Sequence, residues 1–126
     1  MSTKKLRRVL LRERQGEGRG TDVSVDLVVR ENGDLVLEGW DVGAAPQEIF
    51  GDSDYEYWLT ILSEDKNRVL EELLAEVGGH ARASGDQDEL LLDLLVERFS
   101  TSHTPDGDLK EWLTARGIPS TFSSYA

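Results

Sequence analysis

Apolar and polar residues alternate along the first half of the chain with a period of two, the pattern of half-buried β-strands. The clearest run covers residues 22–29, in which valines and Leu27 occupy every second position. Similar alternation over residues 6–13, 34–40 and 55–62 predicts three further strands. The first half of the chain is therefore expected to form a sheet of about four strands.

Strand geometry assigns successive side chains to opposite faces of the sheet. In the first predicted strand, Val9 and Leu11 share one face and Leu6 and Leu10 share the other. The fourth predicted strand carries two sets of side chains, which are Tyr55, Tyr57, Leu59 and Ile61 on one face and Glu56, Trp58, Thr60 and Leu62 on the other.

Asn32-Gly33 predicts a hairpin between the second and third strands. A two-residue turn would place Leu27 opposite Glu38, whereas a three-residue loop over 31–33 would place Leu27 opposite Leu37. The longer loop also requires a left-handed residue, a conformation that Gly33 adopts without strain. Because the second register keeps the apolar faces aligned, it is the preferred one.

From residue 63 onward, apolar residues recur at intervals of three and four, which predicts three amphipathic helices. Ser63 is a good N-cap for the first helix, which Gly78-Gly79 ends. Asp86 opens the second helix in a capping-box pattern, and Thr104-Pro105 opens the third. Gly117 ends the third helix in a Schellman arrangement. The residues expected to be buried are Val69, Leu70, Leu73, Leu74, Val77, Leu91, Leu92, Leu94, Leu95, Val96, Phe99, Leu109, Trp112 and Leu113.

Strands first and helices second is the order of an α+β fold. We expect one domain over residues 1–126, in which an antiparallel sheet is covered on one face by the helices. The strand-rich part covers 4–62, the helix-rich part 63–117, and the extended tail 118–126 could add an edge strand. The sheet face opposite the helices keeps apolar residues that need cover from a loop, the tail, a second subunit or a partner; they are Val28, Val36, Trp40 and Trp58.

The composition narrows the class of protein. The chain has 126 residues and no cysteine, which excludes disulfides and thiolate metal sites. No apolar run approaches the ~20 residues of a membrane-spanning helix. The basic N-terminus lacks the apolar region of a signal peptide. We therefore expect a soluble, cytoplasmic protein.

The charge of the chain is distributed unevenly. Residues 1–20 carry seven Lys or Arg and two Glu, although the net charge of the whole chain is −11. An acidic body repels nucleic acid and anionic lipid. The basic segment could touch phosphate locally, but we expect its residues to pair with acids on the neighbouring strands.

Residues 51–58 concentrate three carboxylates and three aromatic rings in eight positions. Tyrosine and tryptophan contribute strongly to protein interfaces, and an acidic rim suits a basic partner. The sequence therefore predicts a protein-binding or inhibitory module without catalytic machinery. Homodimerisation through the uncovered strand face is a further hypothesis. The predicted binding surface consists of Trp40, Asp52, Asp54, Tyr55, Glu56, Tyr57 and Trp58.

The alternative function is a metal-assisted hydrolase or a ligand-binding domain. In an extended segment, Asp52, Asp54 and Glu56 point to the same side and, together with Asp41, could hold a hard cation. The pattern fails as an EF-hand because Tyr57 occupies the position of the required glycine. No histidine pair at ligand spacing and no serine nucleophile motif accompanies these acids, so no cofactor is predicted.

Overall fold

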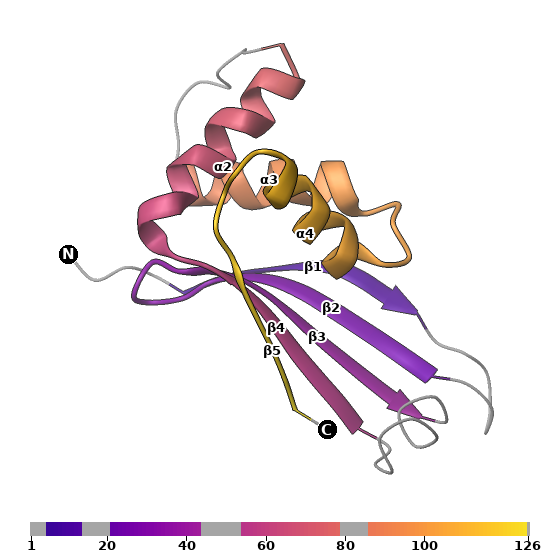
Figure 1. The fold of residues 1–126 in the computed structure, drawn as a ribbon. Coiled ribbons are helices and arrows are strands. Elements are labelled where there is room, and N and C mark those ends of the chain that lie inside the picture. The colour runs from indigo at the N-terminus through magenta and orange to yellow at the C-terminus, as the bar shows by residue number, and fades with distance from the viewer. Residues whose placement is uncertain (1–4, 14–20, 44–53, 79–85, 126) are drawn as a thin grey trace.

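The computed structural model describes residues 5–13, 21–43, 54–78 and 86–125. All five strands in these segments form one antiparallel sheet in the order β1-β2-β3-β4-β5, and the three helices pack on one of its faces (Figure 1). This arrangement confirms the predicted α+β fold. The elements are β1 (Leu6–Glu13), β2 (Thr21–Val29), β3 (Leu35–Gly43), β4 (Asp54–Ile61), α2 (Ser63–Glu76), α3 (Gln87–Phe99), α4 (Pro105–Ala115) and β5 (Thr121–Tyr125).

The hydrophobic core lies between the helices and the sheet face that they cover. Leu27, Leu37 and Leu59 stand side by side across β2, β3 and β4, and each is at most 1% exposed. Burying such side chains supplies the main driving force for folding, about 2 kcal/mol for each fully buried leucine. The helices complete the core with Val69, Leu70, Leu73, Leu91, Leu92, Leu94, Leu95, Phe99, Leu109, Trp112 and Leu113.

The β2–β3 hairpin has the register that the apolar pattern favoured. Leu27 pairs with Leu37, and the backbone amide of Arg30 donates a hydrogen bond to the carbonyl of Asp34 at 2.9 Å. Gly33 has a φ of 93°, the left-handed conformation that the three-residue loop requires. The prediction of this loop is therefore confirmed.

A β-bulge in β1 changes the predicted faces of that strand. The pairing with β2 jumps from Val9 opposite Asp26 to Leu11 opposite Val25, which leaves Leu10 as an extra residue. Leu10 is buried and Leu11 packs against the core, whereas Val9 is 52% exposed. Placing Leu11 with Val9 was therefore wrong, because strict alternation cannot register an inserted residue.

The start of α2 also differs from the prediction. Ser63 is the first helical residue rather than the N-cap, which is Leu62, and no side chain at the cap position accepts a hydrogen bond. Instead, the Ser63 amide donates to Asp34 Oδ1 at 3.0 Å, so the β2–β3 hairpin supplies the missing acceptor. Val77, which was expected in the core, follows the last helical residue and is 50% exposed.

The remaining helix boundaries agree with the sequence. The Asp86 side chain caps α3 by accepting a hydrogen bond from the Asp88 amide at 2.9 Å. After α4, the Ile118 amide donates to the Leu113 carbonyl and Gly117 has a φ of 68°, which is the Schellman arrangement. The longest helix in the described part has 14 residues, and no helix there meets the requirements of a membrane span.

The extended tail forms β5 and joins the sheet beside β4, as Figure 1 shows. Phe122 pairs with Leu59 on the helix-covered side, and its ring stacks on that of Tyr57 at 6.2 Å between centroids. The predicted edge strand is confirmed, and its register decides which of its side chains lie near the candidate site.

Candidate functional site

The alternation of β4 divides the predicted binding surface between two faces of the sheet. Tyr55 and Tyr57 point toward the helices, where Tyr57 belongs to the core. Glu56 and Trp58 occupy the face opposite the helices, which we call the open face. Trp40 pairs with Glu56 and therefore shares that face. The described side chains of the predicted surface therefore lie on two faces and do not form one continuous surface.

Tyr57 is a core residue rather than part of an exposed surface. Its side chain is 5% exposed, and its ring covers Gly39, the residue opposite it on β3. A Cβ atom at Gly39 would lie 2.0 Å from Tyr57 Cζ, so only glycine fits under the ring. Burial, followed by the negative charges of Asp106 and Asp41, raises the pKa of Tyr57. Tyr57 therefore anchors the sheet under the helices.

Asp41 is separated from Glu56 by the thickness of the sheet. Asp41 belongs to β3, pairs with Tyr55 of β4 and lies on the helix-covered side. Its Oδ1 is buried there without a hydrogen-bond partner in the described part of the chain. Burial, followed by the charge of Asp106, raises the pKa of Asp41. Asp41 and Glu56 therefore cannot converge on one cation.

The other two predicted metal ligands are Asp52 and Asp54. Asp52 lies outside the described residues, and for Asp54 only the backbone pairing with Val42 is described. The described residues contain no group of three or more side chains that could hold a metal ion. The metal-site interpretation thus gains no support from the geometry.

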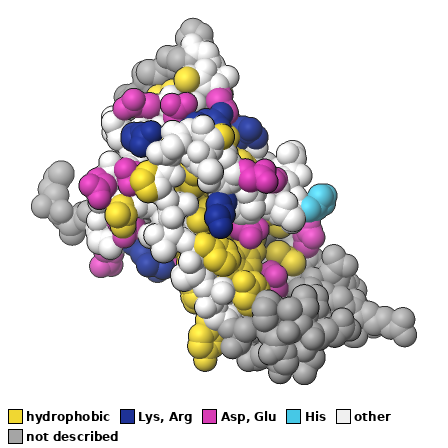
Figure 2. Space-filling view, in the orientation of Figure 1, with side chains coloured by type: hydrophobic (Ala, Val, Ile, Leu, Met, Phe, Trp, Pro, Cys, Tyr) yellow, Lys and Arg dark blue, Asp and Glu magenta, His cyan; other side chains and the backbone are white. Residues whose placement is uncertain are grey.

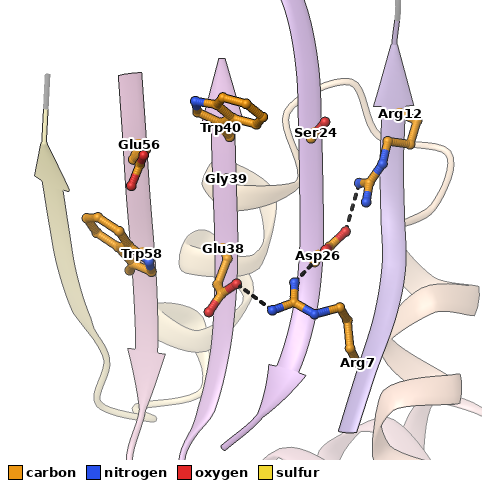
Figure 3. Close-up of a pocket in the computed structure, with 9 residues that line it drawn as sticks. All are labelled: Arg7, Arg12, Ser24, Asp26, Glu38, Gly39, Trp40, Glu56 and Trp58. Carbon is orange, nitrogen blue, oxygen red and sulfur yellow. Dashed lines mark hydrogen bonds and ion pairs between the residues drawn. The ribbon is translucent and has the colours of Figure 1, made fainter. Parts of the chain in front are cut away.

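A shallow groove runs across the open face from β1 to β4 (Figure 3). Its volume is about 550 Å³. Trp40 is 47% exposed there, whereas Val28 and Val36, farther along the same face, are fully buried. The part of the open face around Trp40 is therefore more accessible than the part around Val28 and Val36. The lining residues are Arg7, Arg12, Ser24, Asp26, Glu38, Gly39, Trp40, Glu56 and Trp58.

Most charges of the groove are paired within it. The guanidinium of Arg7 lies over β2, donating to Asp26 Oδ2 at 2.5 Å and to Glu38 Oε1 at 3.1 Å (Figure 3). Arg12 Nη1 lies 2.7 Å from Asp26 Oδ1. Burial alone would raise the pKa of Asp26. The hydrogen bonds and positive charges of Arg12 and Arg7 outweigh this effect and lower the pKa of Asp26. The expected pairing of basic first-strand residues with neighbouring acids is thus confirmed for these two arginines.

Glu56 is the exception among the acids of the groove. It is exposed and forms no hydrogen bond or ion pair with any residue that the structure describes. Its neighbours in the sheet are Trp40 on β3 and Tyr125 on β5, and Trp58 follows two positions later on the same face. A carboxylate without a partner among the described residues therefore lies between three aromatic side chains, and we call this group the Glu56 site.

Tyr125 was missed by the sequence-based prediction of the surface. It is 71% exposed, and it reaches the Glu56 site only because β5 pairs with β4 in the observed register. The available signal was an aromatic residue in an uncharged, extended tail. Its position across from Glu56 required the pairing partner of the tail, which the local pattern does not specify.

The chain was compared with protein-family models, with curated proteins and with solved structures. None of these comparisons gave a significant match. The interpretation of the Glu56 site therefore depends on its own geometry and charge.

Proposed function

We propose that the protein is a protein-binding module whose Glu56 site receives a cationic side chain from a basic partner. The observation that carries the proposal is the Glu56 carboxylate, which lies between Trp40 and Tyr125 and has no partner in the part of the chain that the structure describes. This proposal keeps the predicted basic partner but moves the contact surface to the open face of the sheet. Tyr55 and Tyr57 support the site from the other face and do not contact the partner.

The chemistry of the site suits arginine in particular. A guanidinium group is flat, so it can stack on an exposed aromatic ring while it donates paired hydrogen bonds to a carboxylate. Neighbouring strands are roughly 5 Å apart, so Trp40 and Tyr125 each lie one strand spacing from Glu56, close enough to contact an arginine side chain bound at its carboxylate. A cation over an exposed aromatic ring gains about 0.5–1 kcal/mol and more when water is excluded.

Charge pairing within the groove directs the partner to Glu56. The carboxylates of Asp26 and Glu38 already form ion pairs with Arg7, so they attract an incoming cation less strongly than Glu56 does. The net charge of −11 would steer a basic protein toward this surface and make association sensitive to salt. A binding or inhibitory role toward a basic protein follows from this arrangement.

Affinity capture from cells of the source organism tests the proposal. The wild-type chain and Glu56→Gln serve as baits, with Glu111→Gln on the exposed side of α4 as the matched control for loss of one charge. We expect a basic partner that the wild type and Glu111→Gln retain and that Glu56→Gln loses. Identical partners on all three baits would contradict a role for Glu56.

A further inference from the structure

The two edges of the sheet are built differently. The β1 edge carries Arg7, Arg8 and Arg12 and is interrupted by the bulge at Leu10. The β5 edge, Thr121–Tyr125, has a continuous register with β4, no proline and no charged residue. Charges and bulges are devices that keep edge strands from pairing with other chains. They are present on β1 and absent from β5.

The β5 strand is accessible along its whole length. All five of its residues are exposed, with Phe122 at 42% and Tyr125 at 71%. A strand at a sheet edge leaves the backbone donors and acceptors on its outer side without sheet partners. An exposed and uncharged edge strand of this kind is a template for strand addition.

We propose that β5 pairs antiparallel with β5 of a second copy, so that one continuous sheet runs through a homodimer. The distribution of charge indicates that the chain that pairs with β5 is a second copy of this protein. Among the elements that the structure describes, β5 is the only one without a charged residue, whereas self-contact through the acid-rich helices would bring carboxylates together. Two charged side chains beside β5, Lys110 near the Phe122 ring and Glu56 across from Tyr125, have opposite signs.

The side chains of β5 are complementary to themselves in this orientation. Full overlap of two five-residue strands places Ser123 on the two-fold axis and maximises the backbone hydrogen bonds. Thr121 then stands opposite Tyr125 of the second copy, and Phe122 stands opposite its Ser124. Each aromatic residue faces a small one, so both exposed rings are partly covered without a clash.

The unequal edges also set the size of the assembly. Pairing of β5 with β5 uses the same surface on both copies and closes after two, whereas pairing of β5 with β1 would continue into a filament. The bulge and the arginines of β1 oppose the second mode. A five-residue ladder buries less than the roughly 1,000 Å² expected of stable interfaces, so the dimer should exchange with monomer.

Analytical ultracentrifugation over a wide range of protein concentration tests the dimer with charge-swap variants. We expect the wild type to dimerise as concentration rises. Ser123→Lys and Ser123→Glu should each remain monomeric, because like charges meet on the two-fold axis, and an equimolar mixture of the two should restore the dimer mass. Thr101→Lys, an exposed position away from β5, is the control and should dimerise like the wild type.

Three results would overturn the inference: a wild type that stays monomeric, a dimer that survives Ser123→Lys, or a mixture that fails to restore it. Circular dichroism of each variant establishes that loss of the dimer is not loss of the fold. The dimer and the proposed function share Tyr125, but their tests are separate, because the Ser123 variants change the strand edge whereas Glu56→Gln removes the charge of the Glu56 site. The two proposals therefore fail separately.

Discussion

Gly39 affects both faces of the sheet, because it lies under the Tyr57 ring on one face and lines the groove on the other. On the helix-covered face, the Tyr57 ring occupies the space that a side chain at residue 39 would need. The ring is also held by Tyr55, whose centroid is 5.5 Å away, and by Phe122. On the open face, Gly39 lines the groove beside Trp40.

Gly39→Ala is expected to destabilise the protein by about 1–3 kcal/mol, the range for overpacking in a filled core. The added methyl group would lie 2.1 Å from Tyr57 Cε2, and the packed ring has little room to move. Gly107→Ala in α4 is the control, because a Cβ there meets nothing within 4 Å. That change should stabilise the helix by about 0.5–1 kcal/mol. Urea unfolding measures both, and equal stabilities of Gly39→Ala and wild type would contradict this packing.

Single residues of the candidate site were only partly predictable from the sequence. Alternation correctly separated Tyr57 from Trp58, because a strand has a fixed period. Gly39 went unnoticed, although an isolated glycine within a strand pattern signals the close approach of another group. Asp41 was grouped with Glu56 on the basis of residue type alone, and its position in β3 places it on the other face.

The three helices are joined by one carboxylate at the end of α2. Glu76 accepts hydrogen bonds from Trp112 of α4 and from Arg116, which follows that helix, both at 2.8 Å. It also accepts one from Arg98 of α3 at 3.0 Å. Burial would raise the pKa of Glu76, but Trp112, Arg98 and Arg116 together lower it. Glu76 thus fixes the relative positions of the three helices.

Glu76→Gln is expected to cost about 1–3 kcal/mol of stability at neutral pH, because it weakens charge-assisted hydrogen bonds to three side chains. Since the folded state lowers the Glu76 pKa, its contribution is complete above the unfolded pKa of about 4.3. It is lost as the pH falls through the folded pKa. Urea unfolding of wild type and variant should therefore differ at pH 7 and converge in acid. Glu111→Gln is the control, and a Glu76→Gln difference that persists unchanged in strong acid would contradict the role of the charge.

The elements themselves followed closely from the sequence. Alternation gave the bounds of β1, and capping chemistry gave the start of α3 and the end of α4. The errors arose where a distant residue or an insertion decided the outcome. Asp34 replaces the cap that Ser63 was expected to provide, and the Leu10 bulge reverses the face of Leu11. The cap and the bulge both depend on pairing between residues far apart in the chain, so the local sequence pattern does not predict them.

At the scale of the whole molecule, the two layers carry their charges differently. Asp and Glu side chains are spread over the helix layer in Figure 2. On the open face, two arginines of β1 pair with the acids of β2 and β3. The sequence showed the excess of acids but not which of them remain unpaired, because that depends on strand register. The Glu56 site becomes visible only after all five strands are aligned.

The proposed function requires the Glu56 site to bind a cationic side chain. The three tryptophans provide reporters for it, because Trp40 and Trp58 lie at the site, whereas the Trp112 indole nitrogen is bound to Glu76 among the helices. Their indole signals can be followed separately by nuclear magnetic resonance. A blocked Gly-Arg-Gly peptide is the probe, and the same peptide with neutral citrulline in place of arginine is the matched control.

The most direct test is therefore to titrate the arginine peptide while recording the three indole signals. We expect saturable shifts at Trp40 and Trp58 and none at Trp112, with no response to the citrulline peptide. Glu56→Gln should weaken binding roughly tenfold or more, in line with the loss of a charge-assisted hydrogen bond. Shifts that are absent, equal for both peptides or unchanged in Glu56→Gln would contradict the cation site.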